Sequence, residues 1–244
     1  MKDHPILMNG TNVVRILEGR KTQTRRVMRP QPKKKDNGFW EWKNCGWNRD
    51  DIGPPAPTLR RGPFGCAGDR LWVRETFHYG WSQEEHFYNG MDGESLSELV
   101  WTRGDVDPSE DIVWYAADGP PGHVGMYDEW ATQKTPSIFM PKWACRLWLD
   151  VVDVRVERLQ SITAEDAQAE GIEICGTADG VPLLPLNGII REHPLWADPK
   201  NATVDDYWTG YFARSWNKIN AKRGFGWEAN PWVWVVEFEH KENS

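Results

Sequence analysis

The chain is poor in cysteine: its 244 residues include four, and no two of them form a C-x-x-C pair. No set of cysteines and histidines has the ligand spacing of a zinc site. The acidic run at 105–111 lacks the glycine and the terminal glutamate of a calcium-binding loop. We therefore predict neither a metal site nor a cofactor, and the scattered thiols indicate a reducing compartment.

Long apolar segments are also missing. No apolar run approaches the roughly 18 to 20 residues that span a bilayer. The start, MKDHPILMNG, has no basic segment followed by an apolar one, as a secretory signal would. We expect no membrane partner and a cytoplasmic location.

Aromatic and turn-forming residues are abundant instead. The 16 Trp, 22 Gly and 17 Pro residues favour many short strands and turns over a helical bundle. We predict an α+β fold that is mostly β, with a few flanking helices. The apolar content of 39% can fill one large core. We expect a single domain, 1–244, with insertions at about 30–67, 78–111, 119–137 and 172–204.

Positive charge is concentrated near the start of the chain. Residues 15–35 contain nine basic residues and one acid, Glu18, which gives this stretch a net charge of +8 in a chain of −7. The remainder therefore carries −15. Such a balance argues against a protein whose whole surface coats nucleic acid and indicates one basic patch on an acidic body.

The octet at 19–26, GRKTQTRR, fits the pattern G-x-K-x-x-T-x-R. It follows a predicted helix that Asn9 could cap and that ends at Gly19, because glycine permits the sharp turn needed there. If a strand begins at Thr24, then Thr24 and Arg26 share one face and Arg25 points to the other. The octet thus offers an amine, a hydroxyl and guanidinium groups to an anionic ligand.

Periodicity predicts further elements along the chain. They are strands at 70–77, 144–159 and 232–239, a short strand within IVWYAADG at 112–119, and helices at 163–171 and 205–220. The alternation along 144–159 slips near Val151 and Val152, which predicts a β-bulge. Thr163 and Asp166 have the spacing of a capping box, and Glu170 lies in the last turn of that short helix.

In this order, the octet, the segment GDRLWV at 68–73, the helix segment LQSITAEDAQAEGI at 159–172 and the final strand at 232–238 resemble the ASCH family. The chain is most similar to the phage and prophage members, which are longer and rich in Trp. The resemblance implies a small PUA-like β-barrel that binds nucleosides or RNA in its cleft. It also implies the host cytoplasm as the location if the chain is phage-encoded.

One bacterial branch of the family, similar at the octet, hydrolyses N4-acetylcytidine to cytidine and acetate with a Lys, a Thr and a helical Glu. The resemblance places these candidate catalytic roles on Lys21, Thr24 and Glu170, and Arg26 is the remaining match in the octet. That branch is a compact domain without long insertions. The insertions expected here would therefore cover or redirect the cleft.

The residues fit this chemistry on their own terms. A threonine hydroxyl is a poor nucleophile unless a neighbouring base activates it. Lys21 can be that base if burial or the adjacent arginines lower its pKa. Glu170 could orient Lys21 or carry a proton to the leaving amine, and Arg26 could hold a carbonyl or phosphate oxygen. An exposed basic strand and an exposed helical Glu are the plainer interpretation of the same residues.

The candidate substrate-binding residues are Arg26, Arg25, Gly19, Arg74, Glu75 and Trp72. Glu75 is included because alternation places it on the apolar face of the strand at 70–77, beside Leu71 and Val73, where an acid must be paired or reactive. Pairing with Arg74 or another arginine is the structural alternative. Trp72 could stack on a base or fill the core.

Three classes of function remain open at this point. The first is a hydrolase whose partner is a modified pyrimidine nucleoside, or RNA or DNA that contains one. The second is a non-catalytic module that binds RNA or DNA, and the third is a phage structural or interaction protein. A ribonuclease activity is a further option within the resemblance, and the sequence does not fix the oligomeric state.

Overall fold

The structure is a computed structural model of the chain. It describes residues 1–36, 39–43, 45–47, 62–80, 112–118, 133–172, 176–178, 181–183 and 203–240. Much of the four insertions expected from the sequence lies outside these residues. The statements that follow concern the described residues.

Five strands form the central sheet, in the order β1 (Asp3–Leu7), β6 (Arg70–Arg74), β10 (Trp148–Arg158), β13 (Trp232–His240) and β2 (Gln23–Val27). Strand β13 runs antiparallel to both of its neighbours, β10 and β2. Its register with β10 shifts between Val151 and Asp153, which confirms the predicted bulge. No pairing joins β1 to β2 in the described part of the chain, so the sheet is open there.

In the part of the chain that the structure describes, three α-helices accompany the sheet: α1 (Gly10–Leu17), α4 (Ala164–Ala169) and α5 (Val204–Asn220). The side chain of Asn9 caps α1 by accepting a hydrogen bond from the backbone N–H of Asn12 at 2.9 Å. Helices α4 and α5 both begin with a capping box, formed by Thr163 with Asp166 and by Thr203 with Asp206. The caps expected at Asn9 and Thr163 are therefore confirmed.

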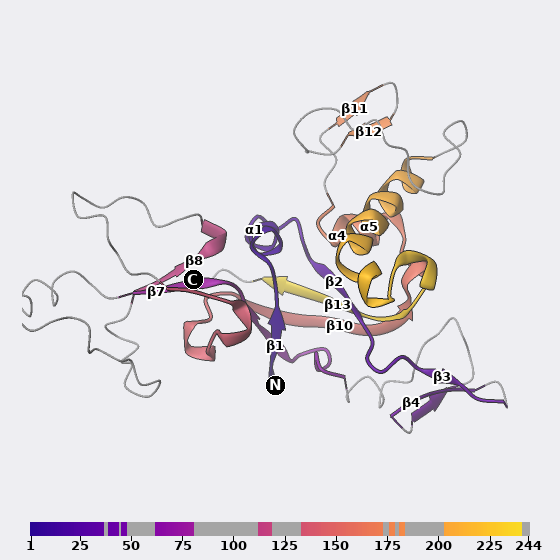
Figure 1. Cartoon of the computed structure of the whole chain (residues 1–244), viewed down its shortest axis with the longest axis horizontal. Helices are drawn as coiled ribbons and strands as arrows, with labels where there is room; N and C mark the ends of the chain where they lie inside the picture. The colour runs from indigo at the N-terminus through magenta and orange to yellow at the C-terminus, as the bar shows by residue number, and fades with distance from the viewer. Residues whose placement is uncertain are drawn as a thin grey trace, which may run out of the picture. The chain divides into compact units, whose positions relative to one another are not determined.

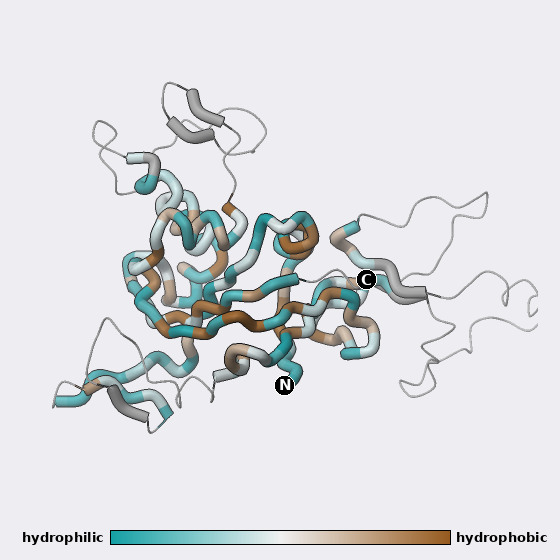
Figure 2. Tube along the Cα trace, turned by 180° about the vertical axis from the view of Figure 1, so that it is seen from behind, coloured by the Kyte–Doolittle hydropathy of each residue, from teal (hydrophilic) through white to brown (hydrophobic). Residues whose placement is uncertain are grey.

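Helices α4 and α5 lie side by side on one face of β10 and β13 (Figure 1). Phe212 and Trp216 of α5 and Ala167 of α4 pack against Val233 and Val235 of β13. The opposite face of β13 is also buried along its first part, so the five residues Trp232–Val236 are all apolar and buried. Figure 2 shows the hydrophobic residues along the central strands.

Smaller elements complete the described structure. A three-stranded sheet has the order β3 (Lys33–Lys34), β4 (Trp40–Trp42), β5 (Cys45–Trp47), and a second has the order β8 (Ile112–Tyr115), β7 (Phe77–Gly80), β9 (Gln133–Thr135). Strands β11 (Gly176–Ala178) and β12 (Val181–Leu183) form an antiparallel pair. The 3-10 helices are η3 (Ala116–Asp118), η4 (Ser137–Phe139), η5 (Lys142–Ala144), η6 (Leu159–Ser161), η7 (Ala221–Arg223) and η8 (Trp227–Ala229).

The chain divides into two compact units. The first consists of Met1–His4, Arg15–Leu71 and Trp148–Ser244, and the second of Pro5–Val14 and Trp72–Leu147. The octet, α4, α5 and strands β2, β10 and β13 belong to the first unit. Each unit is described by itself below.

The mixed α and β structure, mostly sheet with few helices, agrees with the predicted α+β class. The element at 70–77 differs from its prediction: β6 ends at Arg74 and β7 begins at Phe77. The chain leaves the ladder there because the backbone N–H of Glu75 donates to Met140 Sδ and the carbonyl of Thr76 accepts from Ala116 N. Among the helices described, none is long and apolar enough to cross a membrane.

Candidate functional site

The backbone of the octet is fixed between α1, α4 and β13. Gly19 has a φ of 69°, the left-handed conformation that glycine adopts without strain. The next residues turn back onto the helix, since the N–H of Lys21 donates to the Arg15 carbonyl at 3.0 Å. Thr22 then bridges two elements: its N–H donates to Ala169 O of α4 at 2.9 Å, and its carbonyl accepts from Phe238 N of β13 at 2.9 Å. Lys21 is thereby held beside the C-terminal end of α4.

Lys21 and Glu170 form a buried ion pair. The Lys21 amine donates to Glu170 Oε2 at 2.9 Å and to the backbone carbonyl of the same residue at 2.8 Å. Lys21 is 3% exposed and Glu170 is 8% exposed. Glu170 follows the last residue of α4, where helix carbonyls lack intrahelical partners. A lysine amine is a suitable donor there because a cation is stabilised at the C-terminal end of a helix.

Burial makes the charged form of Lys21 less favourable than it is in water. Burial lowers the pKa of Lys21 below its ordinary value of 10.5, against the attraction of Glu170, which raises it. The charges of Arg26 and Arg15 lower the pKa further. A lysine amine that can lose its proton nearer to neutral pH can act as a general base.

Glu170 has a second oxygen that is not hydrogen-bonded. Its Oε1 atom is buried, lies 3.5 Å from Arg25 Nη1 and accepts no hydrogen bond from the described residues. The Nη1 and Nε atoms of Arg25 are also buried without a hydrogen bond. Buried polar atoms without partners are rare in folded proteins, and they call for an explanation such as a bound ligand or a catalytic role.

Arg25 is held by two acids on the face of β2 that α4 covers. Its Nη2 donates to Asp166 Oδ2 at 2.7 Å and to Glu157 Oε2 at 3.3 Å, and its side chain is fully buried. Burial opposes ionisation of Asp166, but Arg25 and the hydrogen bond from Thr163 N hold the pKa of that carboxyl below 3.8. Asp166 thus links the cap of α4 to the octet.

Thr24 occupies the other face of β2. It is 3% exposed and lies opposite Val236 of β13, whereas Arg25 lies opposite Val235. No hydrogen bond joins its hydroxyl to Lys21 or Glu170, although all three residues are described. The structure therefore brings Lys21 and Glu170 together and leaves Thr24 close in sequence but unbonded to this pair.

Arg26 is half-buried on the same face of β2 as Thr24. Burial lowers the pKa of its guanidinium, and the charge of Glu170 raises it. Arg26 is therefore within electrostatic reach of Glu170. Gly19 contributes a turn rather than a close approach, because a Cβ placed on it would meet no atom within 4 Å.

The remaining candidates, Trp72, Arg74 and Glu75, belong to the second unit. Glu75 is fully buried, as expected, but its partner is Arg146 and not Arg74: Arg146 Nε donates to Oε1 at 2.9 Å and Nη2 to Oε2 at 3.2 Å. Arg74 lies over the Trp72 ring, with Cζ 5.3 Å from its centroid, and donates to the Ile138 carbonyl. The described side-chain contacts of Arg74 and Glu75 lie within their own unit.

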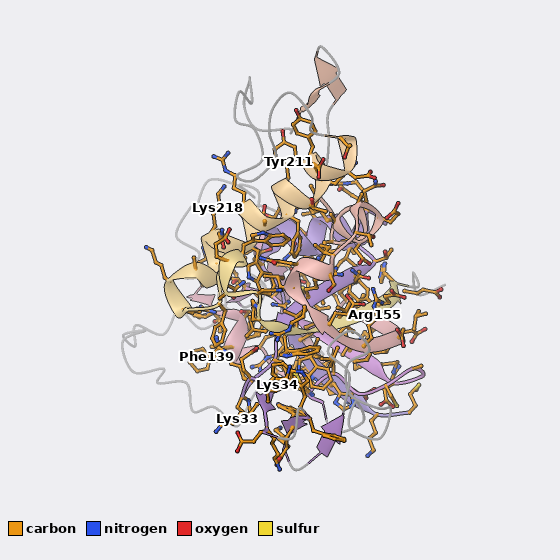
Figure 3. All side chains as sticks on the ribbon, turned by 90° about the vertical axis from the view of Figure 1, so that its right-hand side faces the viewer. Lys33, Lys34, Phe139, Arg155, Tyr211 and Lys218 are labelled. Carbon is orange, nitrogen blue, oxygen red and sulfur yellow. The ribbon has the colours of Figure 1, made fainter. Side chains whose placement is uncertain are left out.

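Sequence reasoning missed Arg155, which connects the acidic residues around the octet. Arg155 of β10 donates to Gln23 Oε1 and Asp166 Oδ1, each at 3.1 Å (Arg155 is labelled in Figure 3). Burial lowers the pKa of Arg155, but the hydrogen bonds that Arg155 donates to Glu157 and Glu237 raise it above its ordinary value. The available signal was the alternation of charge in RVER at 155–158, where Arg155 and Glu157 share one face.

No family model, curated protein or solved structure matches the chain. Among the described residues, no group of His, Cys, Asp and Glu side chains could hold a metal ion.

Proposed function

We propose that the chain binds a modified cytosine nucleoside, or a nucleic-acid segment that carries one, and hydrolyses the N4-acyl amide. The observation that carries this proposal is the buried pair of Lys21 and Glu170, in which Lys21 lies three residues before Thr24 in the octet. The pair combines a lysine whose pKa burial lowers with a carboxylate that has one oxygen without a hydrogen bond. The resemblance to ASCH proteins supplies the substrate, and a PUA-like closure of the open sheet is part of the proposal.

In the proposed reaction, neutral Lys21 takes the proton of the Thr24 hydroxyl as Thr24 Oγ1 attacks the acyl carbon. The tetrahedral intermediate collapses, the bond from the acyl carbon to N4 breaks, and the N4 nitrogen receives the proton from Lys21. Water, deprotonated by the same amine, then attacks the acyl carbon of the Thr24 ester. The bond from that carbon to Oγ1 breaks, Oγ1 takes the proton back from Lys21, and the carboxylic acid is released. Glu170 keeps the Lys21 amine in place, and Arg26 stabilises the oxyanion.

Substrate binding must bring the Thr24 hydroxyl to about 3 Å from the Lys21 amine, because proton transfer requires hydrogen-bond contact. Such contacts are commonly long in unliganded enzymes and shorten in the substrate complex. Lys21 precedes β2, which is the terminal strand in the sheet order. Movement at this position would strain the backbone hydrogen bonds that Lys21 and Thr22 make, but it would break no second ladder of strand pairing in the described sheet.

Binding without hydrolysis is the second candidate, and one observation favours it. The Lys21 amine already donates to both Oε2 and the backbone carbonyl of Glu170, and Thr24 is bonded to neither residue. In that case the octet supplies charge and shape to the ligand, and Lys21 has no chemical role.

The deciding experiment measures cytidine and acetate released from N4-acetylcytidine by the full chain. Thr24→Val keeps the shape of the side chain and removes the nucleophile, so we expect activity to be lost. Thr22→Val, an exposed threonine two residues earlier, is the matched control and keeps activity. Lys21→Met should lower kcat/KM by about 10²- to 10⁴-fold.

Thermal unfolding of each variant establishes that it is folded. If wild-type protein binds N4-acetylcytidine but releases no acetate, binding without hydrolysis is the correct function. If Thr24→Val is as active as Thr22→Val, the covalent route through Thr24 is wrong.

A further inference from the structure

The stretch at 29–43 includes the hairpin of β3 and β4 and carries a patch of exposed positive charge. Its exposed cationic residues are Arg29, Lys33, Lys34, Lys35 and Lys43. The described acids of this stretch are Asp36 and Glu41, and Glu41 forms an ion pair with Lys35. The patch therefore has a net positive charge on a protein whose overall charge is −7. Lys33 and Lys34 of β3 are labelled in Figure 3.

Two tryptophans of β4 fix this hairpin on β13, within the first unit. Trp42 is 2% exposed and meets the ring of Trp234 edge-on, with centroids 5.2 Å apart. Its indole N–H donates to the Pro30 carbonyl at 2.9 Å. Trp40 meets Trp232 in the same way at 5.4 Å. Because β13 is a central strand of the sheet, the hairpin is a preformed surface.

Cationic groups lie over the aromatic rings of this hairpin. The Lys34 amine is 5.8 Å from the centroid of Trp40, and the Arg158 guanidinium is 4.8 Å from the same ring. Trp40 is half-buried, and Phe39 beside it is 44% exposed. A ligand at this surface meets positive charges and the edges or faces of aromatic rings together.

We propose that this basic hairpin binds a single-stranded polynucleotide, with phosphates at Lys33, Lys34 and Arg29 and an unpaired base on Phe39 and Trp40. Such ligands are recognised by a positive surface along the backbone and by aromatic rings on which bases stack. A duplex offers the same charge but keeps its bases stacked on one another, so Phe39 and Trp40 would gain nothing from it. An acidic peptide carries negative charge without flat rings and would leave the same residues unused.

This inference goes beyond the deacylation, because binding at the hairpin does not require chemistry at Lys21. It also adds a consequence for that reaction: the acylated cytosine would reach the octet as part of a strand. In that respect it rests on the proposed function, and the two are tested separately.

The test measures the affinity of the full chain for a fluorescein-labelled oligouridylate of about twelve nucleotides, within the site sizes of roughly 4 to 16 known for single-strand binders. The oligodeoxythymidylate of equal length distinguishes RNA from DNA. We expect Lys33→Gln with Lys34→Gln to weaken binding about tenfold. Losing two phosphate contacts should also reduce the slope of log K against log salt by about 1.4.

The matched control is Lys218→Gln with Lys222→Gln, which removes two exposed lysines elsewhere in the same unit. Its affinity should equal that of wild type. Phe39→Ala should weaken binding about fivefold to 150-fold, the range expected when one stacked base loses its aromatic partner.

Equal losses in the two double variants, or competition by polyglutamate as strong as by the oligonucleotide, would overturn the proposal. Lys21→Met separates it from the proposed function. Strand binding that survives Lys21→Met and falls with the hairpin variants supports the hairpin site even if no deacylation is found. Deacylation of the free nucleoside without strand binding supports the reaction and rejects the hairpin site.

Discussion

Glu170 in the first unit and Glu75 in the second are both buried glutamates with a cationic partner, yet their surroundings differ. Both oxygens of Glu75 accept hydrogen bonds from Arg146, which also pairs with Asp118 through contacts of 2.5 and 3.0 Å. Glu170 binds Lys21 through Oε2 only, and Oε1 is buried without a hydrogen bond. Both oxygens of Glu75 are therefore hydrogen-bonded, whereas Oε1 of Glu170 can still accept a hydrogen bond.

The partners differ in chemistry as well. A guanidinium stays charged at all ordinary pH values and binds a carboxylate in a fixed bidentate geometry, whereas a buried lysine can change its protonation state. Burial raises the pKa of Glu75, and the charge of Arg146 opposes that rise. The Arg146 guanidinium does not release a proton at ordinary pH values. Burial lowers the pKa of Lys21. The Arg146 pair suits a structural role, and the Lys21 pair suits proton transfer.

The sharpest test of this contrast replaces each glutamate by its amide. Glu170→Gln should lower kcat/KM for deacylation by about 10²- to 10⁴-fold, since the amide no longer provides the charge that orients the Lys21 amine. Glu75→Gln should leave kcat/KM within about twofold of wild type, because its contacts lie in the other unit. Steady-state release of cytidine measures both. A similar loss in the two variants would remove the distinction drawn here.

Arg146→Met tests whether the pair of Arg146 and Glu75 stabilises the fold. The change leaves a fully buried carboxylate without its counter-charge, and breaking such a pair costs about 3 to 5 kcal/mol of unfolding free energy. Urea unfolding measures this loss. Adding Glu75→Gln to Arg146→Met should recover part of it, since an unpaired amide is less costly to bury than an unpaired charge. No recovery would mean that Arg146 stabilises the unit through its contact with the Tyr115 ring, 3.9 Å from Cζ to centroid.

The two sites should also give pH dependences of opposite sign. Because the folded pKa of Lys21 is lowered, its contribution to stability is complete above 10.5 and is lost as the pH falls through the folded pKa. Because the folded pKa of Glu75 is raised, its contribution is complete below 4.5 and is lost as the pH rises through the folded pKa. Each slope is at most about 1.4 kcal/mol per pH unit for one proton.

Urea unfolding across the pH range checks both signs. Lys21→Met should flatten the profile on the alkaline side, and Glu75→Gln should flatten it on the acid side. A profile that Lys21→Met leaves unchanged would show that the amine keeps an ordinary pKa, and it would weaken the case for a base at this position.

The local features of the fold were readable from the sequence. The capping box of Thr163 and Asp166 and the bulge at Val151 depend on neighbours within a few residues, so pattern alone predicts them. Strand β1 was missed because a five-residue strand with little alternation gives a weak signal.

The contacts between distant residues were not readable in the same way. The strand period correctly buried Glu75, but the same period turns Arg74 to the opposite face, so its neighbour in sequence could not be its partner. Arg146 lies 71 residues away and is placed by the fold. The pairing of Lys21 with Glu170, 149 residues apart, followed from the family resemblance and not from periodicity.

The smallest effect is expected at an exposed ion pair between Arg20 of the octet and Glu18, the residue just before the octet. Arg20 donates to Glu18, and the two side chains are 35% and 49% exposed. Exposed pairs contribute about 0 to 1 kcal/mol because water and salt screen them, so Glu18→Gln should change the unfolding free energy by less than about 1 kcal/mol and leave deacylation unaltered. Unfolding and activity measured in low and high salt check this. A loss of activity with Glu18→Gln would mean that the exposed charge of Glu18 contributes to the reaction. Burial alone would then not distinguish Glu170, the reactive carboxylate, from the other carboxylates.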